Sequence, residues 1–121
     1  MTRGRRLASR TVALTALLAV GAAAAHAAPA HPGKTRTVGV VSDYFDPDAI
    51  TIHQGDRIKY VWKGGGLSGH DVNVDSGPEQ FHSPTQYAGT FVHTFKKTGT
   101  YKLYCTQHED MVQTVKVKKR R

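Results

Sequence analysis

The chain is 121 residues long, with 17 Lys and Arg against 9 Asp and Glu and a formal net charge of +8. This length is that of one compact domain rather than several. The single cysteine excludes an internal disulfide and leaves three roles for the thiol: a free group, an intermolecular link or a metal ligand.

The first 27 residues have the layout of a secretory signal peptide. Four arginines precede a run from 12 to 25 that is almost wholly Ala, Leu and Val. The triplets A-H-A (25–27) and A-P-A (28–30) fit cleavage after residue 27 or as late as residue 30. The run is short for a membrane span, which needs roughly 20 residues, and an uncleaved anchor is the alternative. We therefore expect export to the periplasm or the extracellular or cell-wall space, with no stable membrane insertion after cleavage.

The positive charge is concentrated at the two ends of the chain. Loss of the signal lowers the formal charge to about +4, because 13 Lys and Arg remain against 9 Asp and Glu. Much of this excess is the final K-V-K-K-R-R, which is either a solvated tail or a docking patch for an acidic partner. A nucleic-acid interface combines a basic patch with aromatic platforms. The middle of the chain has neither, so we expect no nucleic-acid partner.

Residues 28–35 are predicted to form a flexible leader with two prolines, and the pattern of short strands begins at residue 36. Apolar residues occupy every second position at Ile58, Tyr60 and Trp62, which is typical of a half-buried strand. Ile50 and Ile52 show the same alternation before the Gly55-Asp56 turn. Further strands are predicted at 37–41, 70–74, 90–95, 101–105 and 112–117, with loops at 64–69 and 75–87.

No amphipathic helical pattern follows the signal. Short strands with turns about every 8–12 residues are typical of an all-β sandwich. We therefore predict an all-β, Greek-key β-sandwich of seven to eight strands over residues 36–118, with a basic tail at 119–121. Trp62 is predicted to lie in the core, and His53 and His93 are predicted to be exposed on polar strand faces.

The lone thiol lies in the heptapeptide C-T-Q-H-E-D-M, which carries Cys105, His108 and Met111. His70 follows a glycine-rich loop at the start of another predicted strand, and loops at one end of a Greek-key sandwich can converge. One thiolate, two imidazoles and a weak thioether form the ligand set of a blue-copper site. Taken singly, each residue would be an ordinary core or surface residue. Zinc, the competing metal, rarely recruits Met in a structural site.

The chain resembles the small cupredoxins of the plastocyanin, pseudoazurin and amicyanin group over residues 37–118. The resemblance is carried by F-D-P-D-A-I-T-I-H-Q-G-D-R-I-K-Y-V-W, G-H-D-V and T-F-K-K-T-G-T-Y-K-L-Y-C-T-Q-H-E-D-M. It implies one copper ion per chain, with His70, Cys105, His108 and Met111 as ligands. The C-x2-H-x2-M spacing is the shorter, amicyanin-like version. The family's role is single-electron transfer between larger redox proteins, so a redox partner is expected to dock near His108.

Several positions depart from the family pattern. They are Asp71 in place of Asn, Gln107 in place of Pro, Glu109 and Asp110 in place of apolar residues, and Gln113 in place of Gly. We expect Asp71 to accept a hydrogen bond from the hydroxyl or the backbone of Thr106. Its negative charge beside copper should lower the reduction potential. The polar and acidic surround of His108 favours a basic or polar partner.

The resulting hypothesis is an exported, monomeric type 1 copper protein that cycles between Cu(II) and Cu(I) and is not an enzyme. No open coordination position and no acid–base or nucleophilic set is apparent in the sequence. Two alternatives stay open. One is a copper-binding or trafficking cupredoxin-like protein without a dedicated redox partner, and the other is a secreted β-sandwich interaction domain with a fortuitous cysteine.

Overall fold

The computed structural model describes residues 32–64 and 68–121, so the predicted signal peptide (1–27) and most of the leader lie outside the described residues. The described part of the chain is built of strands, and no helix in it is long and apolar enough to cross a membrane. The strands are β1 (Thr35–Val41), β2 (Tyr44–Asp46), β3 (Ala49–His53), β4 (Arg57–Trp62), β5 (Asn73–Ser76), β6 (Thr90–Thr94), β7 (Gly99–Cys105) and β8 (His108–Lys118).

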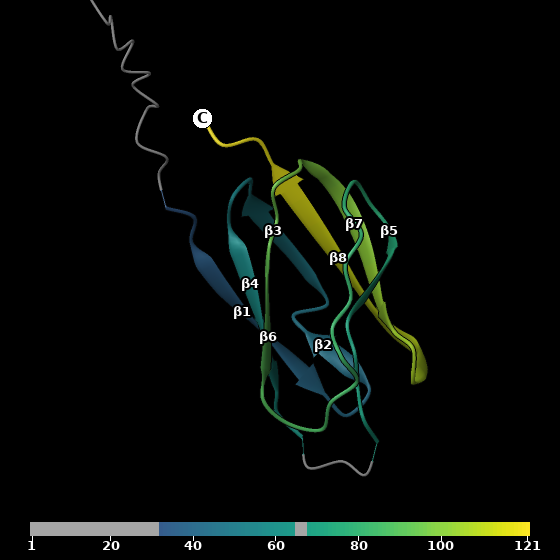
Figure 1. Cartoon of the computed structure of the whole chain (residues 1–121). Helices are drawn as coiled ribbons and strands as arrows, with labels where there is room; N and C mark the ends of the chain where they lie inside the picture. Colours follow the sequence, from purple (N-terminus) through teal and green to yellow (C-terminus); the bar gives the residue numbers. More distant parts are fainter. Residues whose placement is uncertain (1–31, 65–67) are drawn as a thin grey trace, which may run out of the picture.

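These eight strands form two four-stranded sheets that enclose one core (Figure 1). One sheet has the order β2-β1-β4-β6 and the other has the order β3-β8-β7-β5. β1 pairs in parallel with β4, and β3 pairs in parallel with β8, whereas the remaining pairs are antiparallel. The predicted all-β sandwich of seven to eight strands is therefore confirmed.

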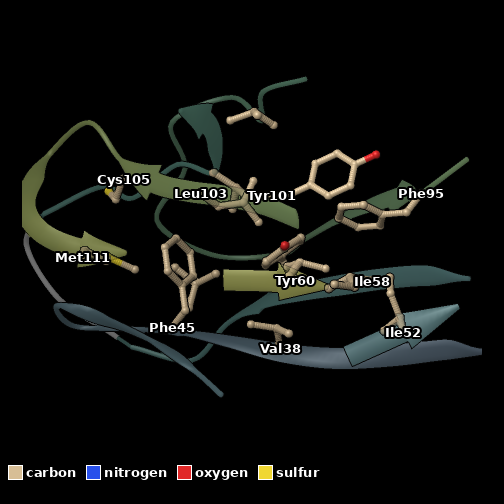
Figure 2. Packing of buried hydrophobic residues seen from close by; sticks show 14 of the residues in the cluster. Val38, Phe45, Ile52, Ile58, Tyr60, Phe95, Tyr101, Leu103, Cys105 and Met111 are labelled. Atoms are coloured by element: carbon tan, nitrogen blue, oxygen red, sulfur yellow. The ribbon is translucent and has the colours of Figure 1, made fainter. Parts of the chain in front are cut away.

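The core is made by alternate residues of the long strands. In β7, Tyr101, Leu103 and Cys105 are buried while the residues between them are exposed. The same alternation puts Met111 of β8 inside, in line with Val115. Cys105 and Met111 lie at one end of the core, and Ile52 and Phe95 lie at the other end (Figure 2). The predicted ligands therefore cap the apolar interior at one end of the sandwich.

The structure changes the secondary structure predicted around the ligands. β8 begins at His108, and Cys105 pairs directly with His108 across a tight turn. The sequence had indicated that His108 and Met111 lie in a loop. The structure places both in strand β8. His70 precedes β5 and forms only an isolated bridge with Gln86.

The prediction that His93 is exposed was wrong, whereas His53 is exposed as expected. His93 stacks on Phe81 at 3.6 Å between ring centroids and meets Phe95 edge-on at 4.8 Å. Burial lowers the pKa of His93, and Glu79, whose carboxylate lies 3.9 Å from Nε2, opposes this shift. The reason is parity: His93 lies two residues from each of Phe91 and Phe95, so it shares the face of the strand that these aromatic side chains occupy.

Candidate metal centre

Three of the four predicted ligands meet at one end of the sandwich. The Nδ1 atom of His70 lies 3.9 Å from the Sγ atom of Cys105. The rings of His70 and His108 lie 4.7 Å apart between centroids, tilted by 32°. Met111 is fully buried at the same end of the core as Cys105 (Figure 2).

The local fold explains how residues 35 positions apart come together. The period-two alternation of β7 turns Cys105, its last residue, toward the core. The two-residue turn that follows brings His108 opposite Cys105, and β8 then carries Met111 back along the inner face. His70 lies in the connection between β4 and β5, which reaches the same end of the sandwich as Cys105.

His70 is held by its backbone on two sides. Its carbonyl accepts a hydrogen bond from the indole nitrogen of Trp62 at 3.1 Å. Its N–H and C=O exchange hydrogen bonds with Gln86, both at 3.0 Å. Trp62 is buried, as predicted, but the sequence did not indicate that its indole N–H positions His70. The alternating pattern shows which face a tryptophan occupies, and not which atom its N–H reaches.

Electrostatics favours the form of His70 that binds metals. Burial lowers the pKa of His70, and the neighbouring His108 lowers it further, while Asp71 and Asp43 oppose the shift. A metal ligand must be the neutral imidazole. The lowered pKa keeps His70 neutral over a wider pH range than an exposed histidine.

Asp71 makes the hydrogen bonds to Thr106 that the sequence predicted. Its Oδ1 accepts from the backbone N–H of Thr106 at 2.7 Å, and its Oδ2 accepts from the Thr106 hydroxyl at 2.5 Å. The sequence missed two further donors: the side-chain amide of Asn73 at 2.8 Å and the hydroxyl of Thr85 at 3.1 Å. The carboxylate therefore ties the β4–β5 connection to the turn between β7 and β8.

These hydrogen bonds also set the charge of Asp71. Burial would raise the pKa of the carboxyl, but the hydrogen bonds from Thr106 and Thr85 outweigh it and lower the pKa below its usual value. Asp71 is thus a buried carboxylate, ionised over the neutral range. Its backbone N–H in turn donates to the Cys105 sulfur at 3.5 Å.

The donor atoms fit a soft metal ion. Two ligands with bonds of about 2.0–2.3 Å can lie as far apart as the 3.9 Å between His70 Nδ1 and Cys105 Sγ. His108 Nε2 is buried without a hydrogen-bond partner, an arrangement that is costly for a polar atom and that a metal bond would relieve. Within residues 32–64 and 68–121, however, no three His, Cys, Asp or Glu side chains already form a group that could hold a metal.

The fold and the cluster of thiol, imidazole and thioether define the class of copper-binding β-sandwiches. The family model for the cupredoxin-like domain matches residues 12–117, and the chain belongs to this family. No curated protein matches the chain in sequence. The family and its copper-containing structural neighbours support one copper ion per chain, as the sequence predicted.

Three solved structures illustrate the similarity. A variant of amicyanin in its reduced Cu(I) form is 22% identical, with a TM-score of 0.60, and the match covers 74% of this chain and 85% of that one. Pseudoazurin from Methylobacterium extorquens AM1 is 24% identical, with a TM-score of 0.58, over 73% of this chain and 78% of its own. These two identities establish the fold alone.

The third is a copper-containing nitrite reductase from Thermus scotoductus SA-01. It is 30% identical, with a TM-score of 0.61, over 67% of this chain. The chain spans only 21% of the length of that enzyme. The similarity is therefore to one portion of the reductase.

Proposed function

We propose that the chain is an exported, monomeric, mononuclear copper protein that passes single electrons between redox partners. His70, Cys105, His108 and Met111 would hold the ion. The observation that carries the proposal is the meeting of Cys105, His70 and His108 beside the buried Met111, at one end of a cupredoxin sandwich. One thiolate, two imidazoles and a thioether are the donor set of blue-copper electron-transfer sites.

The surroundings of the ligands suit this role. The bound ion would supply the Cu(II)/Cu(I) couple. Cys105 and Met111 are locked in the core, and Asp71 ties the two ligand-bearing segments together. A cage of this kind limits movement of the ligands on a change of charge, and rapid electron transfer needs small reorganisation.

The half-buried His108 is the ligand through which the electron would pass. His70, Cys105 and Met111 are buried, whereas His108 retains intermediate exposure. Glu109 and Asp110, which follow it, are exposed. A redox partner with a polar or basic surface would therefore dock here. The proposed role is not enzymatic, because all four side chains of the cluster would be taken up as ligands of the ion.

A copper titration tests the proposal. With one equivalent of Cu(II), the protein should develop an intense thiolate-to-copper absorption near ~600 nm and a narrow copper hyperfine splitting, as blue sites do. Cys105→Ser should abolish the colour. His53→Ala, which removes an exposed imidazole far from the cluster, should leave it unchanged.

Other outcomes would replace the proposal. A colourless protein that takes up copper weakly would indicate copper handling without a dedicated redox partner. The absence of stoichiometric copper, with no change in Cys105→Ser, would indicate an interaction domain with a fortuitous cysteine.

A further inference from the structure

The end of the sandwich opposite the metal centre carries a basic hollow. β8 runs from the turn beside Cys105 to the C-terminal end of the chain at the other end of the molecule (Figure 1). A hollow of about 680 Å³ opens there. We call this end the basic pole; the hollow is lined by Lys34, His53, Asp56, Lys118, Lys119, Arg120 and Arg121.

The basic pole is a built surface rather than a loose tail. The carbonyl of Lys118 accepts from the backbone N–H of Gln54 at 2.8 Å, so β8 is paired to its end. Arg120 donates through Nε to the Gln54 carbonyl at 3.0 Å and forms an ion pair with Asp56. The side-chain amide of Gln54 also holds the carbonyl of Lys96 at 2.9 Å, which brings a further cationic turn to the same end.

The positive charge of the hollow is largely unneutralised. Among the described residues that line it, Asp56 is the one with a carboxylate side chain, and that group already accepts hydrogen bonds from the backbone of Lys34 and of His53 besides its pair with Arg120. Among the ion pairs of the described residues, Arg120 is the one lining cation that takes part. Lys118, Lys119 and Arg121 therefore present their charges to whatever approaches.

The two ends of the molecule differ in the sign of their charge. Glu109 and Asp110 are exposed next to His108, one of the proposed ligands. Asp43 is also exposed, and its charge raises the pKa of His70. The eleven residues of β8 at about 3.3 Å per residue separate these acidic groups from the basic pole by about 35 Å. An anionic surface would attract one end and repel the other, so it would orient the molecule.

The occupant is indicated by the chemistry of the pole. Within residues 32–64 and 68–121, the large exposed hydrophobic side chains are Tyr44, Tyr87, Val92, Tyr104 and Val112, and none of these lines the hollow. Contact would thus be electrostatic, without insertion of side chains. The described chain begins with Pro32 at this same end, close to Lys34, so in the alternative of an uncleaved anchor the apolar run from 12 to 25 would be joined to the domain here.

We propose that the basic pole docks on the anionic phosphate headgroups of a membrane surface. The opposite end, which carries the four proposed ligands and is called the metal end below, would then face the surrounding medium. Each Lys or Arg near an anionic bilayer adds to the attraction, which falls off within a Debye length. Of the two interpretations of the C-terminal basic segment, this proposal takes up the docking patch rather than the solvated tail. The docking itself needs no metal, so it stands apart from the proposed electron transfer.

Vesicle sedimentation with copper-free protein tests the docking. Residues 32–121, which hold all eight strands and the core, and the full chain are each mixed with vesicles of phosphatidylglycerol and phosphatidylcholine or of phosphatidylcholine alone. The pole variant carries Lys118→Gln, Lys119→Gln and Arg121→Gln. The matched control removes the same charge from exposed positions that do not line the hollow, with Lys59→Gln, Lys63→Gln and Lys102→Gln. Fluorescence of the buried Trp62 verifies folding of every variant.

Both forms should bind the vesicles that contain phosphatidylglycerol and should not bind those of phosphatidylcholine alone. About 1 M salt should release both forms from the anionic vesicles. The pole variant should bind at least ~tenfold more weakly, and the control should change by less than about threefold. Equal losses in the two variants would overturn the proposal, as would binding of the full chain alone. Capture of inorganic polyphosphate without binding to the anionic vesicles would show that the ligand is a soluble polyanion, and would also overturn it.

Discussion

The Asp71 carboxylate is the centre of a hydrogen-bond network beside the proposed ligands. Four donors converge on its carboxylate, two from Thr106 and one each from Asn73 and Thr85. A buried carboxylate is stable only when its oxygens are paired. The same network that keeps Asp71 ionised therefore places a fixed negative charge next to the residues that would hold copper.

Asp71→Asn should raise the reduction potential of the copper-loaded protein. The substitution is nearly isosteric, and the new amide nitrogen can take the place of Oδ2, because the hydroxyls of Thr85 and Thr106 can also accept. Loss of the negative charge removes a preference for Cu(II), so we expect a shift on the order of tens of millivolts upward. Redox titration followed by the visible absorption measures it.

Asp43→Asn serves as the comparison for that shift. Asp43 also acts on His70, but it is exposed, so solvent and salt should reduce its effect to a fraction of that of Asp71. A potential in Asp71→Asn that is unchanged or lower than in the unmodified protein would contradict the role assigned to the carboxylate.

At the scale of strands, Gln113 of β8 links three elements. Its side-chain oxygen accepts from the hydroxyl of Tyr60 in β4 at 2.9 Å, and its amide nitrogen donates to the carbonyl of Pro47 at 2.8 Å, between β2 and β3. Gln113 is buried two residues beyond Met111. The residue that departs from the family's glycine therefore fixes β8 against the opposite sheet, next to the thioether.

Gln113→Leu should lower the free energy of unfolding by about 2 kcal/mol, because the fully buried Tyr60 hydroxyl would lose its partner. Urea denaturation measures the loss. The double variant with Tyr60→Phe should cost clearly less than the sum of the two single variants, since it removes both polar partners together. Additive costs would show that the hydrogen bond contributes little to stability.

The alternating pattern predicted the long strands well because they are half-buried. Ile58, Tyr60 and Trp62 of β4 are all inside, and the pattern at Tyr101 and Leu103 correctly indicated that β7 ends at the thiol. The signal fails where a strand is too short to show a period, as in the three residues of β2. It also failed for β5, where His70 is fixed by Gln86 and Trp62 rather than by a strand.

The ligand set could be proposed from residue types, but the residues that hold these ligands in position could not. Cys105, His108 and Met111 stand out by spacing alone. The partners that hold the cluster, such as Trp62, Thr85 and Asn73, come from distant positions and carry no local motif. Contacts of this kind depend on how the two sheets pack against each other, and the alternation of apolar residues along a strand does not predict that packing.

The whole molecule has opposite ends joined by one apolar core. Cys105 and Met111 cap that core at the metal end, and Ile52 lies near the other end (Figure 2). The metal end is acidic on its surface and the basic pole is not. Binding at either end should therefore change the stability of the same sandwich, because the described residues form one core that reaches both ends.

Copper should raise the thermal stability of the whole domain. The four proposed ligands come from the β4–β5 connection, from β7 and from β8, so the ion would bind the folded chain far better than the unfolded one. At a free copper concentration of about 100 times Kd, the gain is about 2.7 kcal/mol, which for a domain of this size raises the unfolding midpoint by roughly 10–20 °C. Scanning calorimetry with and without copper measures this shift, and a chelator should reverse it. Because the stabilisation needs the thiolate, Cys105→Ser should unfold at nearly the same temperature in both conditions; an equal rise in that variant would mean that copper binds elsewhere on the chain.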